Sequence, residues 1–328
     1  MLTLGRRSRL SYAFEPPIMR LSEDARRSVV FLGHLLDSDD ENSFTAQATG
    51  FFVRYGGIPY LITAAHVAVG LGDDPFQMRL NRLDGGAGII NFDPTLDGLD
   101  KWFLHPEPSV DIAALAFPFA FRADGWDHVS IAENLLLSDA DVAGHDIGPG
   151  DTCYAVGLFR LLQGKQRNLP VVHRGSIAAM PSDELIPLKN WRAEGKVQTR
   201  AYLVEATNLK GLSGSPVLIR PTINIMAHRL QVEGKGETAT WQPGPAAGLS
   251  APSCDVALLG VWSASWDAQT DEVLSLDQGR EVRVPLGLGV VVPTARLIEL
   301  LESGPVKAQR QMFHDAMKKP AEPDATPG

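Results

Sequence analysis

The most informative stretch of the sequence is Lys210-Gly211-Leu212-Ser213-Gly214-Ser215-Pro216. Glycines around Ser213 allow the backbone to turn sharply, so that neighbouring N–H groups can point into one hollow. Such donors can stabilise an oxyanion while a serine hydroxyl attacks a carbonyl carbon. An ordinary Gly/Ser loop has the same composition, so this stretch alone does not distinguish a nucleophile from a simple turn.

A histidine ends an apolar run upstream, in Leu-Ile-Thr-Ala-Ala-His-Val (61–67). His66 is either a buried core side chain or a general base, since the ordinary pKa of imidazole suits proton transfer near neutrality. The small residues Ala64 and Ala65 beside it leave room for the ring to turn toward a cleft. Taken alone, this segment favours the core position.

An aspartate lies inside a second apolar run, Val-Asp-Ile-Ala-Ala-Leu (110–115). Burying a carboxylate is costly unless a partner compensates it. Asp111 is therefore more informative than Asp97 and Asp100, which belong to a polar turn. The alternative is an aspartate that caps a turn at the end of a strand.

The three segments become informative through their order. A serine nucleophile needs a base, and the base needs a carboxylate to hold its tautomer. The order His66, Asp111, Ser213 is that of the chymotrypsin arrangement, whereas α/β-hydrolases run serine, acid, histidine. The hydrolase elbow would also require glycine at position 215, which is serine here. The sequence therefore predicts a His66–Asp111–Ser213 triad.

Composition and charge exclude several other classes of function. The 328 residues carry a net charge of −9, which argues against nucleic-acid binding. The two cysteines do not form the disulfide framework of a secreted domain, and Cys153 is expected to be a buried free thiol. No signal peptide or membrane span is recognised, so a cytoplasmic protein without membrane contact is expected. The eight histidines show no ligand spacing, and we expect no metal and no cofactor.

The rest of the chain reads as two series of short strands, rich in turns because of 31 glycines and 23 prolines. Segment 220–255 is expected to be a lengthened loop or an extra hairpin, and 294–303 a short helix. The predicted divisions are an N-terminal arm (1–27), a first β-unit with the histidine and aspartate (28–131), a connector (132–150), a second β-unit with the serine (151–303) and a frayed tail (304–328).

Three motifs resemble the His, Asp and Ser blocks of the trypsin-like (chymotrypsin-fold) serine peptidases. They are TAAHV (63–67), DIAAL (111–115) and GLSGSPV (211–217). The likeness is greatest to the bacterial branch related to glutamyl endopeptidases and HtrA-type proteases, and it spans roughly residues 28–303. It implies an all-β fold of two six-stranded antiparallel Greek-key β-barrels with a short C-terminal helix. The active site would lie in the cleft between the barrels.

The same resemblance implies a role for each residue of these motifs. Ser213 would be the nucleophile, His66 the base and Asp111 the acid that orients it. The backbone N–H groups of Gly211 and Ser213 would form the oxyanion hole, and Ser215 would be structural. The implied activity is that of a serine endopeptidase that hydrolyses a polypeptide substrate through an acyl-enzyme.

The chain departs from the family pattern at two positions, and the resemblance also implies which residues would form the specificity pocket. Leu212 stands where digestive members have an aspartate that pairs with a new N-terminus, so that activating ion pair is absent. Lys210 is an unusual charged neighbour of the oxyanion loop. With no acidic residue at the pocket base, a neutral, small or polar P1 residue (on the acyl side of the scissile bond) is expected. The predicted pocket residues are Thr207 and Asn208 at the base and Ser263, Ala264, Ser265 and Gly289 in the walls.

Two other functions remain compatible with the sequence. One is a catalytically silent binding module that retains the trypsin-like fold. The other is a peptidase kept latent until an activating protein partner reorders its loops. Segment 220–255, the missing N-terminal ion pair and the two tails favour this second alternative.

Overall fold

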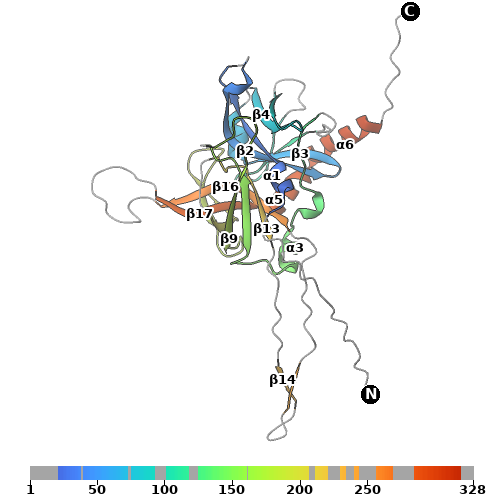
Figure 1. Ribbon diagram of the computed structural model, residues 1–328. Helices are drawn as coiled ribbons and strands as arrows, with labels where there is room; N and C mark the ends of the chain where they lie inside the picture. The colour runs from blue at the N-terminus through green and yellow to red at the C-terminus, as the bar shows by residue number, and fades with distance from the viewer. Residues whose placement is uncertain are drawn as a thin grey trace, which may run out of the picture.

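The computed structural model describes most of the chain between residues 21 and 318. Most of its β-strands belong to two units, a large sheet and a closed barrel (Figure 1). The described ranges are 21–37, 40–72, 75–92, 101–117, 125–160, 162–206, 211–220, 230–233, 240–243, 256–268 and 284–318.

The first unit is a seven-stranded antiparallel sheet in the order β5-β4-β1-β2-β3-β7-β6. Strand β1 is buried on both faces along its first five residues, which explains its continuous apolar run. In β1, Val29 and Phe31 belong to one core cluster, whereas Val30 and Leu32 belong to another. The strands are β1 (Val29–Leu35), β2 (Phe44–Tyr55), β3 (Ile58–Thr63), β4 (Phe76–Asn81), β5 (Ala87–Phe92), β6 (Phe103–Leu104) and β7 (Ala113–Ala116).

The second unit is a closed six-stranded antiparallel barrel in the order β12-β17-β16-β13-β8-β9. Its interior holds Trp262, Tyr202 and Cys153. Cys153 is a buried free thiol, as predicted, and burial raises its pKa to about 12; Cys254 lies outside the described residues. The strands are β8 (Thr152–Gly157), β9 (Val171–Ala179), β12 (Tyr202–Glu205), β13 (Pro216–Arg220), β16 (Ala257–Ala268) and β17 (Val284–Pro293).

Two hairpins stand apart from these sheets. The strands β10 (Ile186–Lys189) and β11 (Lys196–Thr199) pair antiparallel, and so do β14 (Leu230–Glu233) and β15 (Thr240–Pro243). The second hairpin falls within the segment that the sequence assigned to a long loop or an extra hairpin.

The mostly-β class, the closed six-stranded barrel and the C-terminal helix are confirmed, and the other large sheet has seven strands.

The C-terminal end contains two helices, where the sequence predicted one. Helix α5 (Thr294–Leu301) is the expected one and buries three leucines. Residues 304–318, predicted as frayed, instead form α6 (Gly304–Lys318), which corrects that expectation. Its Pro305 lies in the first turn, where the missing N–H costs no helical hydrogen bond. Arg310 then anchors α6, because its guanidinium bonds the Leu301 carbonyl at 3.0 Å.

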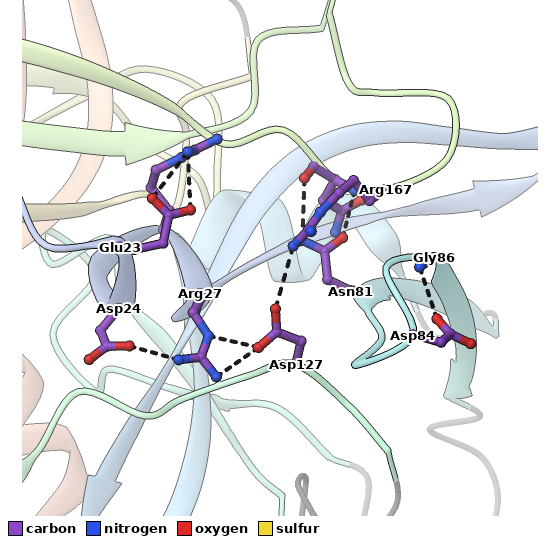
Figure 2. A network of polar contacts seen from close by, with 10 residues as sticks. Glu23, Asp24, Arg27, Asn81, Asp84, Gly86, Asp127 and Arg167 are labelled. Carbon is purple, nitrogen blue, oxygen red and sulfur yellow. Dashed lines mark hydrogen bonds and ion pairs between the residues drawn. The ribbon is translucent and has the colours of Figure 1, made fainter.

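Polar contacts join the N-terminal helix and the β8–β9 loop to the first sheet (Figure 2). Within the predicted N-terminal arm, α1 (Glu23–Arg27) is helical. Arg27 bonds Asp127 at 2.7 Å, and Arg167 of the β8–β9 loop reaches the same carboxylate at 3.4 Å. The Asn168 N–H donates to the Asn81 side chain at 2.7 Å. These bonds hold the loop that leads away from the barrel against the first unit.

The remaining short elements lie on the connections between strands. They are η1 (Glu41–Ser43), α2 (Ala65–Leu71), η2 (Glu133–Leu135) and α3 (Asp139–Gly144). Within the described part of the chain, no helix is both long and apolar enough to cross a bilayer.

Candidate active site

His66 and Asp111 form a hydrogen-bonded pair in the first unit. His66 lies in the first turn of α2, directly after β3, and Asp111 lies just before β7, the strand that pairs with β3. The imidazole Nδ1 is 2.7 Å from Asp111 Oδ2, and the His66 backbone N–H donates to Oδ1 at 2.8 Å. The two contacts hold the ring in one orientation and direct its Nε2 away from the carboxylate.

The two side chains differ sharply in exposure, which suits a base and its buried acid. The His66 side chain is 39% exposed, whereas that of Asp111 is 7% exposed. Burial raises the pKa of Asp111, but the hydrogen bonds and charge interaction with His66 and the hydroxyl of Ser263 outweigh it and hold the pKa below its usual value. Asp111 therefore remains a carboxylate at neutral pH.

Ser263 contributes two contacts that the sequence reasoning missed. Its hydroxyl donates to Asp111 Oδ2 at 2.5 Å, and its carbonyl accepts from the Ser213 hydroxyl at 3.5 Å. The sequence had assigned Ser263 only to a pocket wall. Ser263 belongs to β16 of the barrel, whereas Asp111 belongs to the first unit, so no local sequence motif could indicate that the two side chains meet.

The loop that carries Ser213 has a backbone that only glycine adopts readily. Gly211 and Gly214 have φ of +108° and +83°. A side chain at Gly214 would also lie 2.1 Å from Thr63 Oγ1, so the loop packs directly on β3. Within the described residues, no acceptor is found for the N–H of Gly211 or of Ser213.

Thr49 of β2 connects the first unit to this loop. Its hydroxyl donates to the Gly211 carbonyl at 2.7 Å and accepts from the Leu158 N–H at 2.9 Å. Its backbone N–H donates to the Ser213 carbonyl at 3.0 Å. Thr49 is fully buried, so the loop is held by contacts that exclude water.

One pocket of about 480 Å³ brings the predicted triad together. His66, Asp111 and Ser213 line it with Ser263 and Ala264, both predicted pocket residues. Ser215, by contrast, is fully buried, and a side chain at Gly157 would meet its hydroxyl. Of the two serines in the Ser-Gly-Ser-Pro turn, Ser213 is therefore the one that lines the pocket.

The other predicted pocket residues are not gathered in this way. Ser265 pairs with Gly289 across β16 and β17, and neither lines the 480 Å³ pocket. Thr207 and Asn208, like Lys210, lie outside the described residues. Within the described residues, no group of three His, Cys, Asp or Glu side chains is placed to hold a metal ion.

The β10–β11 hairpin forms a wall of the pocket that the sequence did not predict. Its residues Leu188, Asn190, Trp191 and Val197 line the pocket. At its tip, the Arg192 guanidinium stacks 4.5 Å from the centre of the Trp191 ring and donates to the His105 carbonyl at 2.5 Å. The hairpin thus reaches from the barrel unit to the first unit.

Comparisons with known proteins do not place the chain in a family. No model of a known protein family matches, and neither does any curated protein. Among solved structures, Rv3671c protease from M. tuberculosis in its active form is 16% identical, with a TM-score of 0.43, covering 84% of this chain and 80% of that one. The inactive form of the same protease is 16% identical, with a TM-score of 0.41, and the match covers 84% of this chain and 88% of that one. Deg5 is 16% identical, with a TM-score of 0.37, and the match covers 60% of this chain and 75% of that one. These identities and TM-scores are too low to support a function, so the function is inferred from the geometry of the site alone.

Proposed function

We propose that this protein is a serine endopeptidase that hydrolyses peptide bonds through an acyl-enzyme. The observation that supports it is the shared pocket, in which the His66–Asp111 pair and the Ser213 hydroxyl face the same space. A serine with a base and an orienting carboxylate is the arrangement that acyl transfer requires. These three residues are far apart in the sequence, yet the fold brings them to one cavity.

The proposed reaction begins when Ser213 Oγ attacks the carbonyl carbon of the scissile bond and His66 Nε2 accepts its proton. Asp111 stabilises the resulting imidazolium through the 2.7 Å contact with Nδ1. The N–H groups of Gly211 and Ser213 stabilise the tetrahedral oxyanion. The C–N bond then breaks, the amine leaves with the proton from His66, and water releases the acyl group by the same steps.

A fluorophosphonate probe tests this proposal directly. The probe phosphonylates a serine only when a base removes the proton of its hydroxyl and the oxyanion site accepts the P–O⁻ oxygen. We expect one adduct per chain, located on Ser213 by mass spectrometry of the peptides, and none after heat denaturation. An adduct on another serine, or no adduct in the folded protein, would overturn the proposal.

A latent peptidase that a partner opens is the second candidate. It is favoured by Arg192, which ties the pocket wall to the His105 carbonyl of the other unit, and by the Ser213 hydroxyl, which bonds the Ser263 carbonyl. In this form the hairpin would have to move before a polypeptide enters. Labelling that is absent in the wild type but present in Arg192→Ala would identify it.

Thr49→Val is expected to lower kcat while leaving KM nearly unchanged. The substitution keeps the shape of the side chain but removes the hydroxyl between the Gly211 carbonyl and the Leu158 N–H. Because one oxyanion donor is worth about 10²–10³-fold in kcat, a misplaced Gly211 N–H should cost about 10–100-fold. Steady-state kinetics would measure this.

Thr49→Ser supplies the matched control for that measurement. It restores the hydroxyl and loses only a methyl group, so kcat should return to within a few-fold of the wild type. Equal losses in the valine and serine variants would mean that packing of Thr49, rather than its hydrogen bonds, matters for the loop.

A further inference from the structure

The β10–β11 hairpin presents two aliphatic side chains to the pocket that holds Ser213. Leu188 and Val197 stand directly opposite each other in the register of the two strands. Opposed residues of an antiparallel pair have their side chains on the same face, so these two are neighbours. Both line the 480 Å³ pocket. This face of the hairpin is therefore an apolar wall beside the reacting groups.

The hairpin is fixed to both units, so the Leu188–Val197 wall has a defined position. At its base, Ile186 is 5% exposed and belongs to a core cluster of the barrel unit. At its tip, Trp191 packs against a cluster of the first unit that contains Ala65, the residue before His66. The barrel thus holds one end of the wall, and the elements that carry the base hold the other.

The pocket offers no charged partner to a group that lies against this wall. Among the described residues that line it, only His66 and Asp111 are ionisable, and both belong to the proposed triad. The Asp111 side chain is 7% exposed, and its carboxylate already accepts from His66 and Ser263. A charged side chain that entered here would lose its hydration without gaining a new ion pair. The pocket therefore favours an uncharged group.

The wall also has apolar surface that a ligand could cover. Leu188 and Val197 are each only half-buried in the free protein. A ligand side chain that packs on both removes apolar surface from water, which is favourable. An apolar wall with a few polar groups at defined places, here the hydroxyl of Ser213 and the ring of His66, is typical of a ligand site.

We propose that the Leu188–Val197 wall binds an aliphatic side chain of the substrate polypeptide, leucine, isoleucine or valine, at one of the residues that flank the scissile bond. This inference rests on the proposed function and specifies its substrate class. Because one pocket contains both the Ser213 hydroxyl and the wall, a polypeptide whose carbonyl carbon meets Ser213 can place a nearby side chain against Leu188 and Val197.

Val197→Lys is expected to weaken the preference for an aliphatic side chain in favour of an acidic one. Peptide substrates with leucine or glutamate at each of the two positions on either side of the cleaved bond, changed one at a time, would be compared by kcat/KM. At one position the wild type should prefer leucine by about 10²-fold, within the range in which an apolar pocket discriminates. The variant should lower that Leu/Glu ratio by about 10-fold or more, because its ammonium group attracts glutamate. A wild type without such a position, or a ratio that Val197→Lys leaves unchanged, would overturn the inference.

Gln198→Lys is the matched control for the added charge. Gln198 follows Val197 in β11, pairs with Pro187, is exposed and does not line the pocket. Since successive side chains of a strand point to opposite faces, this lysine lies on the far side of the hairpin. The Leu/Glu ratio should stay within a few-fold of the wild type. An equal change in both lysine variants would show a long-range effect of charge and would contradict a contact at Val197.

Peptide binding to Ser213→Ala separates the wall from the proposed chemistry. Isothermal titration calorimetry should show that the leucine peptide binds this variant more tightly than the glutamate peptide, and that adding Val197→Lys reduces the difference. Equal affinities for the two peptides would refute the wall as a binding site even if Ser213 is labelled in the wild type. If the wild type is not labelled, the proposed function fails, whereas the titration still decides whether the wall binds the peptide. Should Val197→Lys lower the Tm, Val197→Thr keeps the shape of the side chain and should reduce the preference for leucine by a smaller factor.

Discussion

Replacing Ser213 by alanine should lower kcat by about 10⁶-fold, the loss seen when a serine nucleophile is removed from an intact triad. The reason is that Ser213 lines the pocket with His66 and Asp111, and its hydroxyl is the proposed nucleophile of the acyl-enzyme route. Fluorophosphonate labelling should disappear in the same variant. Burst-phase kinetics on an ester substrate and the labelling stoichiometry would measure both effects.

Ser215→Ala is the matched control, since Ser215 lies in the same Gly-Ser-Pro turn. Its hydroxyl is fully buried and, within the described residues, has no hydrogen-bond partner. Removing a buried hydroxyl without a partner should be neutral or slightly stabilising. Activity and labelling should therefore stay close to those of the wild type. Loss of labelling in Ser215→Ala with retention in Ser213→Ala would reverse the assignment of the nucleophile.

Strands such as β1 were predictable from the sequence because burial on both faces makes them continuous apolar runs, whereas β4 (Phe76–Asn81) and β5 (Ala87–Phe92), which are only partly buried, were not predicted. In β1, four consecutive buried residues alternate between two core clusters, so the segment is apolar throughout. Helix α6 was missed for the opposite reason. It buries only Val306 and Gln309, so its sequence lacks a broad apolar stripe, and its Pro305 lies in the first turn, where proline does not interrupt a helix.

His66, Asp111 and Ser213 could be picked out from the sequence because each stands in an unusual local context. Glycines flank the serine, the aspartate interrupts an apolar run, and the histidine follows the end of a strand. The contacts of Ser263, Arg192 and Thr49 were not visible, since these hydrogen bonds join residues 87 to 162 positions apart in the chain.

Asp111→Asn should lower kcat by about 10⁴-fold without unfolding the protein, as expected when a base is held in the wrong tautomer. Asp111 Oδ1 accepts from the His66 backbone N–H, while Oδ2 faces Nδ1 of the ring and the Ser263 hydroxyl. An asparagine keeps its oxygen toward the backbone N–H and presents its NH₂ group to Nδ1. The ring must then carry its proton on Nε2, where it cannot accept one from Ser213.

The pH dependence of the stabilisation by Asp111 follows from its lowered pKa. A carboxylate with a depressed pKa contributes fully above its ordinary value of 3.8, and its contribution is lost only as pH falls through the lower folded-state pKa. The stabilisation that this carboxylate gives the fold should therefore be retained at about pH 5 and lost only at more acid pH, which acid unfolding of the wild type and Asp111→Asn would measure. For the loss of kcat, Ser263→Ala is the control: it removes one of three donors and leaves the tautomer intact, so it should cost far less than the asparagine variant. A loss in Ser263→Ala as large as that in Asp111→Asn would show that the number of hydrogen bonds to the carboxylate, rather than the ring tautomer, determines the rate.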